Sequence, residues 1–195
     1  MIDILLNAAI VVITLVIVIC VFFRKDHQWD LKRGRFALRF FTAQSNVLCA
    51  VAALLFMIFP QSHDAWLLKY IGTAAVTVTM LTVFLFLAPS VGKDWVSVLL
   101  KGPDLFLHLI TPLLALFSFC ALEKRGMDFR TALWGMLPVL LYGPWYLYKI
   151  RFAPEGKRWD DFYGFNKGGK WPISFAMMAI GTFLMCMGLM ALQNL

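Results

Sequence analysis

The sequence predicts an all-α integral membrane protein, with six transmembrane helices in a compact bundle. Hydrophobic residues make up 61% of the 195 residues, the mean hydropathy is +0.77, and charged residues make up only 15%. Soluble domains contain about 45–50% apolar and about 25% charged residues. The charged residues also cluster between long apolar stretches, as they must if those stretches lie in lipid.

A helix needs about 20 apolar residues to cross the bilayer, with a range of roughly 17–25. Six stretches meet this requirement, and they are residues 4–23, 40–59, 70–88, 105–122, 131–148 and 171–192. The residues left over are too few for a second globular unit. We therefore expect a single transmembrane domain over residues 1–195.

The ends of these spans carry recognisable signals. The first span has no basic segment before it and no small-residue cleavage site after it, so we expect a retained helix rather than a signal peptide. Pro60 and Pro89 follow the second and third spans. Residues 102–104 (Gly-Pro-Asp) open the fourth span, with proline near the first turn and an acid at the positive end of the helix dipole. Pro138 and residues 143–144 (Gly-Pro) predict a kinked or broken fifth helix.

Tryptophans and cysteines fit the same interpretation. Tryptophan favours the membrane interface, and five tryptophans lie near span ends, namely Trp66, Trp95, Trp134, Trp145 and Trp171. The four cysteines lie in or beside apolar spans without Cys-x-x-Cys spacing. We expect them to be small buried side chains rather than disulfides or metal ligands.

Basic residues predict the topology. The first, third and fifth loops hold 14 of the 18 lysines and arginines, whereas the second and fourth hold 4, Lys69 among them. The positive-inside rule then places the odd loops in the cytoplasm and both termini outside, and we expect a bacterial inner-membrane protein. The net charge of +7 needs no other explanation, so a nucleic-acid partner is not expected.

Two polar clusters open the second and fourth spans. One is residues 41–46 (Phe-Thr-Ala-Gln-Ser-Asn), and the other contains Asp104, His108 and residues 111–112 (Thr-Pro). His108 is the only histidine inside a span, and an ionisable group there is by default a functional-site hypothesis. Both spans start on the same side of the membrane, and the helical rise of 1.5 Å per residue puts Thr42 and His108 within a few ångström in depth.

A hydroxyl group near a histidine suggests a hydrolase. We expect Thr42 to be the nucleophile and His108 the general base that takes its proton. Asp104, one turn before His108, is a candidate to orient the ring, as the third member of a triad does. Asn46 is a candidate oxyanion donor or orienting group, while Ser45 is a supporting residue and a rival nucleophile.

Each of these residues also has a purely structural interpretation. Threonine and serine in membrane helices often bond to their own helix or to a neighbour, which applies to Thr42 and Ser45. Asp104 suits the role of a helix cap or dipole partner. His108 could supply one buried hydrogen bond between helices.

The two clusters resemble a known family. Phe-Thr-x-x-Ser-Asn at residues 41–46 and His-x-x-x-Pro at residues 108–112 are similar to motifs of the androgen-induced-gene and androgen-dependent TFPI-regulating proteins and their bacterial six-span relatives. The resemblance implies an intramembrane threonine hydrolase acting on fatty acid esters of hydroxy fatty acids. It implies that Thr42 is the nucleophile and His108 the base, whereas Asp104 matches nothing in the family pattern.

Aromatic residues on the same side of the membrane extend the candidate site. Tyr142 and Tyr146 end the fifth span, and Tyr163 and Asn166 lie in the long fifth loop. We interpret these four as substrate-binding candidates, although anchoring at the aromatic belt and a solvated loop are the structural alternatives.

The sequence contains no motif typical of other classes of enzyme. The chain lacks Gly-x-Ser-x-Gly and His-Glu-x-x-His, so we expect no metal and no cofactor. The expected partners are a lipid ester substrate and the bilayer. The main alternative function is a small transporter or lipid-binding protein that uses the same polar pocket, and a third is a structural subunit.

Overall fold

The computed structural model describes residues 1–24 and 26–195. Helices account for 78% of the chain, and no β-strand occurs among the described residues. The longest helices are α1 (Ile2–Cys20), α3 (Phe41–Ile58), α4 (His63–Thr82), α10 (Leu137–Leu147) and α11 (Trp171–Asn194). The all-α prediction is therefore confirmed.

Shorter elements extend or connect these helices. Between α1 and α3 lies α2 (Leu31–Ala37), and α4 continues through η1 (Val83–Leu87), α5 (Ala88–Val91), η2 (Gly92–Asp94) and α6 (Trp95–Leu99). The next helical segment consists of α7 (Pro103–Leu105), η3 (Phe106–Ile110), α8 (Thr111–Phe117) and η4 (Ser118–Leu122). The one after it consists of α9 (Phe129–Leu133), η5 (Trp134–Met136), α10 and η6 (Tyr148–Phe152), and η7 (Lys167–Gly169) precedes α11.

Five helical segments are long and apolar enough to cross a membrane. They are Ile2–Cys20, Phe41–Ile58, His63–Leu99, Pro103–Leu122 and Trp171–Asn194. The segment from α9 to η6 is also helical but is not among the five, because tryptophan, tyrosine, glycine and proline dilute its aliphatic residues. These features are those of an integral membrane protein.

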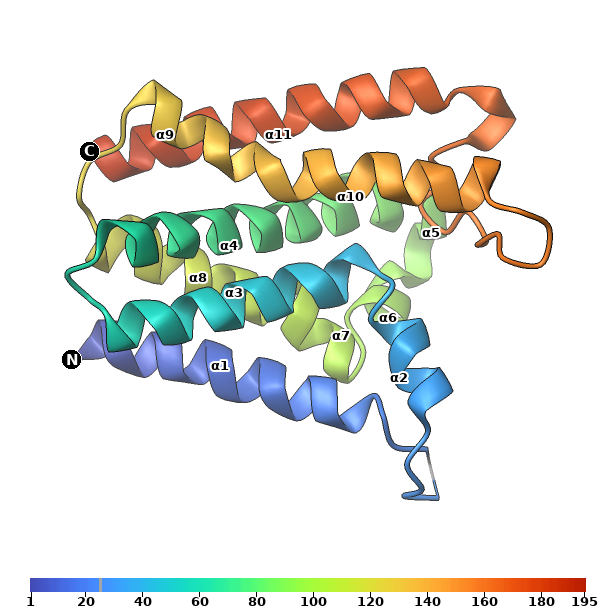
Figure 1. The fold of residues 1–195 in the computed structure, drawn as a ribbon, viewed down its shortest axis with the longest axis horizontal. Helices are drawn as coiled ribbons and strands as arrows, with labels where there is room; N and C mark the ends of the chain where they lie inside the picture. The colour runs from blue at the N-terminus through green and yellow to red at the C-terminus, as the bar shows by residue number, and fades with distance from the viewer. Residues whose placement is uncertain (25) are drawn as a thin grey trace.

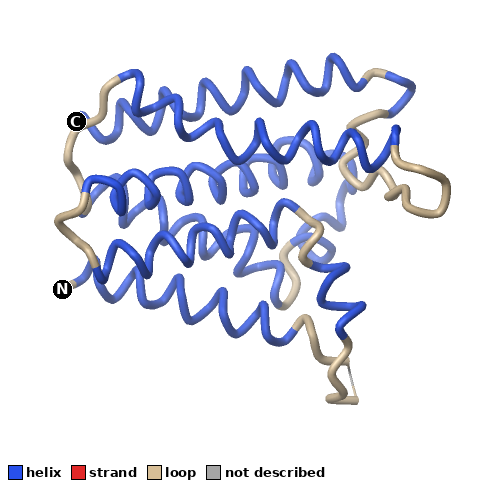
Figure 2. The backbone as a smooth tube through the Cα atoms, in the orientation of Figure 1, coloured by secondary structure: helices blue, strands red, loops and turns tan. Residues whose placement is uncertain are grey.

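The long helices lie side by side and place the connecting segments at two ends. Figure 1 shows both chain termini at one end, with α2, α6 and the connection between α10 and α11 toward the other. In Figure 2 the loops are confined to these two ends. The start of α3 and the start of the segment at α7 therefore share one end, as the order of the spans predicts.

Helix α4 differs from the prediction for its span. It begins at His63 rather than at residue 70, because Ser62 caps it by accepting a hydrogen bond from the Ala65 amide at 3.2 Å. Consequently Trp66 and Lys69 lie inside the helix, with 1% and 0% exposure. Trp66 is a core residue rather than an interfacial one, and Lys69 is not a loop charge.

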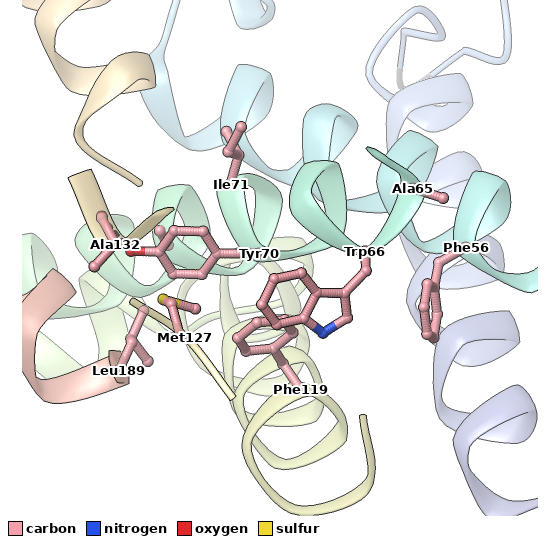
Figure 3. Packing of buried hydrophobic residues seen from close by; sticks show 10 residues of the cluster. Phe56, Ala65, Trp66, Tyr70, Ile71, Phe119, Met127, Ala132 and Leu189 are labelled. Carbon is pink, nitrogen blue, oxygen red and sulfur yellow. Dashed lines mark hydrogen bonds between the residues drawn. The ribbon is translucent and has the colours of Figure 1, made fainter. Parts of the chain in front are cut away.

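Aromatic packing forms the core at the end of the molecule that holds the termini. The Phe119 ring lies 5.5 Å from Trp66 and 5.6 Å from Tyr70, measured between centroids (Figure 3). The polar atoms of these aromatic residues are satisfied, since Tyr70 donates to the Ala132 carbonyl at 2.6 Å and Trp66 to the Glu123 carbonyl at 2.9 Å. Packing and satisfied polar groups are what hold helices together in lipid.

Prolines explain three of the wider, π-helical turns. Proline has no amide hydrogen to give to the carbonyl four residues back, and its ring crowds that carbonyl. The elements η1, η3 and η6 each end two residues before a proline, which is Pro89, Pro112 or Pro154. In each case the residue between them bonds five residues back, as Thr111 does to the Phe106 carbonyl. The break predicted near Pro138 takes the form of η5, a 3₁₀ turn just before α10.

Candidate functional site

An apolar cavity of about 470 Å³ lies between α3, α4, α10 and α11, toward the end that holds the fifth loop. Thr42 is in its wall, together with Tyr142, Tyr146 and Tyr163. The rest of the lining is largely aliphatic, aromatic and thioether side chains, including Val83, Phe86, Met177, Met178 and Met185. The cavity has the size and character of a site for an apolar small molecule.

The fifth loop places Tyr163 in this wall. The Asp161 carboxylate organises the loop by accepting from the Tyr146 hydroxyl at 3.0 Å and from the Phe165 and Asn166 amides at 2.9 and 2.7 Å. The Tyr163 hydroxyl then accepts a hydrogen bond from the Phe41 amide at 3.2 Å, at the start of α3. The loop is therefore tied to the helix that carries Thr42.

Tyr163 is also close to the candidate nucleophile. Burial raises the pKa of the Tyr163 phenol, and the hydrogen bond from the Phe41 amide partly offsets the increase. Since its oxygen accepts from Phe41, the Tyr163 hydroxyl keeps its own hydrogen to donate. Thr42 and this phenolic donor thus line the same cavity, and the donor is bonded to the residue that precedes Thr42.

Ser45 and Asn46 hold α3 to its neighbours. The Ser45 hydroxyl lies 3.1 Å from the Thr42 carbonyl and 2.8 Å from the Thr79 hydroxyl of α4. The Asn46 amide nitrogen donates to the Thr42 carbonyl at 2.8 Å and to the Leu107 carbonyl of η3 at 3.1 Å. Both amide hydrogens of Asn46 are thereby used, which favours an orienting role over oxyanion donation.

His108 is buried within η3, and its tautomer follows from its contact. The Nδ1 atom lies 2.7 Å from the Leu99 carbonyl, which can only accept, so Nδ1 carries the hydrogen in the neutral ring. The Nε2 atom then has the lone pair that a general base needs. In an ordinary α-helix, the amide of residue 112 would donate to the His108 carbonyl, but Pro112 has no amide hydrogen. The His-x-x-x-Pro spacing therefore accounts for the π-helical turn.

The structure brings some of the predicted residues together and not others. The bond from Asn46 to Leu107 makes α3 and η3 neighbours at the depth of Thr42, which the sequence alone could not establish. No hydrogen bond joins Thr42 to His108 in the part of the chain that the structure describes, and His108 is not in the cavity wall. Asp104 is exposed, and the Leu99 carbonyl occupies the orienting position proposed for it.

Of the four predicted substrate-binding residues, three line the cavity and one does not. Tyr142, Tyr146 and Tyr163 line the cavity, and Tyr142 also donates to the Arg39 carbonyl at 3.0 Å. Asn166 is outside the cavity wall and contributes its amide to the Asp161 turn. A second groove of about 460 Å³ shares Phe41 and Tyr142 with the cavity and includes Ser45.

A buried ion pair lies near the opposite end, and no sequence motif predicted it. Lys69 Nζ and Glu123 Oε2 are 3.8 Å apart, with side-chain exposures of 0% and 1%. Asn7 of α1 donates to Glu123 Oε1 at 2.6 Å, and the Ser118 hydroxyl bonds the same oxygen. The available signal was a helix cap at Ser62, which extends α4 far enough to enclose Lys69.

The described residues contain no group of three or more His, Cys, Asp or Glu side chains placed to hold a metal ion. The four cysteines are unpaired. Neither family models nor curated proteins nor solved structures match the chain.

Proposed function

We propose that the protein is an intramembrane hydrolase of lipid carboxylic esters, such as fatty acid esters of hydroxy fatty acids. The observation that carries the proposal is the Thr42 hydroxyl in the wall of a largely apolar cavity that also contains the Tyr163 phenol, which is bonded to the amide of the preceding residue, Phe41. An ester carbonyl at Thr42 would leave its acyl chain among the apolar residues of the cavity. At about 30 Å³ for each water-sized group, 470 Å³ holds roughly fifteen carbon atoms, which is one long acyl chain.

In the proposed reaction, Thr42 Oγ attacks the ester carbonyl while His108 Nε2 takes the hydroxyl proton. The bond to the alcohol oxygen breaks, and the proton leaves with the alcohol, which gives an acyl-threonine. Water then attacks this acyl group, releasing the fatty acid and restoring the Thr42 hydroxyl. The Tyr163 hydroxyl is suited to donate to the oxyanion in both steps.

Two features of the surroundings of His108 support its role as the general base. The Leu99 carbonyl fixes its tautomer with Nε2 unprotonated, and Asn46 links the residue before it to α3 at Thr42. Catalytic hydrogen bonds in ligand-free enzymes are often long and tighten in the substrate complex. Formation of the Thr42–His108 contact on substrate binding is part of the proposal.

Turnover of a fluorogenic long-chain ester by the purified protein in detergent tests the function. We expect Thr42→Ala and His108→Ala to lower kcat/KM by at least about a hundred-fold, the usual contribution of general acid–base catalysis. Ser45→Ala is the matched control because it removes a hydroxyl one turn away, and it should retain most of the activity. Equal activity in wild type and Thr42→Ala would exclude Thr42 as the nucleophile.

One observation favours a second candidate, a lipid-binding or transport protein. Tyr163 shares the cavity wall with Thr42 whereas His108 does not, and a hydroxyl pair can hold a lipid carbonyl without cleaving it. In that case Tyr163→Phe and Thr42→Ala would lower ligand affinity, and no variant would hydrolyse the bound ester. Direct binding of a non-cleavable ether analogue, measured beside turnover, separates the two functions.

The proposal also includes a topology. The segment from α9 to η6 is proposed as a sixth span, with α2 and the loop after η6 in the cytoplasm of a bacterial cell and both termini outside the inner membrane. The concentration of lysine and arginine in the odd loops supports this orientation.

A further inference from the structure

One side of the cavity is open. Outside the fifth loop, the exposed residues of the cavity wall are Leu85 and Phe86 of η1 and Met177 and Gly181 of α11. The first three are apolar side chains that are each more than half exposed. Because all four residues belong to these two elements, the opening lies between η1 and α11.

The opening lies at a depth where hydrocarbon surrounds the protein. Both elements belong to segments that are long and apolar enough to cross a membrane. Met177 and Gly181 follow Trp171, the first residue of α11, by six and ten residues, which corresponds to about 9 and 15 Å along the helix. One leaflet contributes about 15 Å of hydrocarbon, half of the bilayer core. The opening therefore faces the acyl chains of the leaflet on the side of the fifth loop.

Contacts close the cavity toward water and toward the inside of the bundle. The fifth loop covers the end toward water, where the Tyr163 hydroxyl accepts from the Phe41 amide at 3.2 Å. The buried Phe165 ring of this loop lies 6.1 Å from the Tyr146 ring and 6.5 Å from the Phe175 ring, measured between centroids. A molecule arriving from water would have to displace the loop, whereas a lipid chain in the leaflet would not. The inner wall contains buried residues of three helices, namely Thr79, Val139 and Thr182.

Gly181 leaves the opening free of a side chain. A Cβ added at Gly181 would meet no atom within 4 Å, whereas a Cβ added at Gly143, also in the wall, would lie 2.6 Å from the Met178 methyl carbon. A larger side chain at position 181 would therefore extend into the free space of the opening. Gly188, seven residues further along α11, is equally exposed and uncrowded but is not in the cavity wall. The two glycines thus form a matched pair for an experiment.

We infer that the cavity takes its ligand directly from the bilayer, through an entrance between η1 and α11 that Gly181 keeps clear. The ligand's hydrocarbon chain passes between the two elements, while its polar group stays near Thr42 and Tyr163 at the end that the fifth loop covers. The entrance selects molecules that reside in the membrane over esters dissolved in water. This inference rests on the proposed function in one respect, which is that the cavity holds a lipid, and it applies whether that lipid is hydrolysed or only bound.

A removable group at the entrance tests the inference. Gly181→Cys and Gly188→Cys, in nanodiscs of phosphatidylcholine, are treated with benzyl methanethiosulfonate, which attaches an apolar benzyl group through a disulfide that dithiothreitol later removes. Treated wild type controls for the native cysteines, of which Cys49 and Cys186 are buried. The ligand is a fluorescent fatty alcohol, which contains no ester to hydrolyse. Its association and dissociation rates are followed by energy transfer from the protein's tryptophans, with excess unlabelled alcohol as the background.

The benzyl group at position 181 should slow both rates by about ten-fold or more, because entry and release must then wait for the group to move aside. Dithiothreitol should restore both rates, which excludes a folding defect. The same treatment of Gly188→Cys and of wild type should leave both rates within about two-fold.

Two results would overturn the entrance. One is unchanged rates in treated Gly181→Cys, and the other is a lower affinity with an unchanged association rate, since the group would then only fill the cavity. A failure of the untreated proteins to bind the alcohol would overturn the cavity as a lipid site, and with it both proposals. The expected rates without any turnover of an ester would contradict the hydrolase alone.

Discussion

The buried pair of Lys69 and Glu123 makes the sharpest prediction about stability. At 3.8 Å and an effective dielectric constant of about 20, their attraction is about 4 kcal/mol. Removing one member leaves the other charge buried without compensation, which typically costs about 3–5 kcal/mol. We therefore expect Lys69→Met and Glu123→Gln each to lower the free energy of unfolding by that amount. At roughly 2–4 °C per kcal/mol for a chain of this length, the melting temperature should fall by roughly 10 °C.

The double variant decides whether the two side chains interact. Replacing both members of a buried pair is often nearly neutral, so Lys69→Met with Glu123→Gln should be considerably more stable than either single variant. Thermal unfolding in detergent, followed by circular dichroism, measures all four proteins, with the exposed Lys124→Met as the control. If the double variant loses the sum of the two single losses, the two charges do not interact and the buried ion pair is refuted.

Three further variants test packing, the cavity and a helix cap. Gly72→Ala should lower stability by about 1–3 kcal/mol because an added Cβ would lie 2.8 Å from the α3 backbone, whereas Gly188→Ala meets nothing within 4 Å and should be neutral or stabilising in the same melts. Tyr163→Phe should weaken binding of a lipid carbonyl compound by about ten-fold, and the exposed Tyr148→Phe should not; equal affinity in both would exclude a role for the phenol. Hydrogen bonds from Thr131 lower the pKa of Asp128, so its contribution to stability is present above the ordinary aspartate pKa of about 4 and is lost as the pH falls through its lowered pKa. Asp128→Asn should make stability less dependent on pH in this acidic range. The same loss of stability at low pH in Asp128→Asn and wild type would show that Asp128 is not the group responsible.

The helices could be predicted because hydropathy and proline placement act locally. Spans at residues 40–59 and 105–122 match α3 and the segment from α7 to η4 closely. The start of α4 was placed seven residues late because the prediction relied on hydropathy, and Lys69 interrupts the apolar run. Only a partner can make a lysine suitable for burial, and Glu123 lies too far along the chain for a local pattern to reveal the pairing.

The candidate site was predictable in its depth but not in its contacts. Helical rise and the order of the spans place Thr42 and His108 at one level, and the bond from Asn46 to Leu107 shows that their helices touch. The partner of His108 is a backbone carbonyl at Leu99, which no side-chain motif can reveal. The approach of Tyr163 to α3 depends on the turn at Asp161, a tertiary contact of the fifth loop.

Covalent labelling with a lipophilic fluorophosphonate, mapped by mass spectrometry, tests the central proposal most directly. We expect one adduct on Thr42 in wild type, its absence in Thr42→Ala and His108→Ala, and its persistence in Ser45→Ala. An adduct on Ser45 would reassign the nucleophile. No adduct on folded wild-type protein that still binds the lipid would contradict the hydrolase and leave a lipid-binding protein.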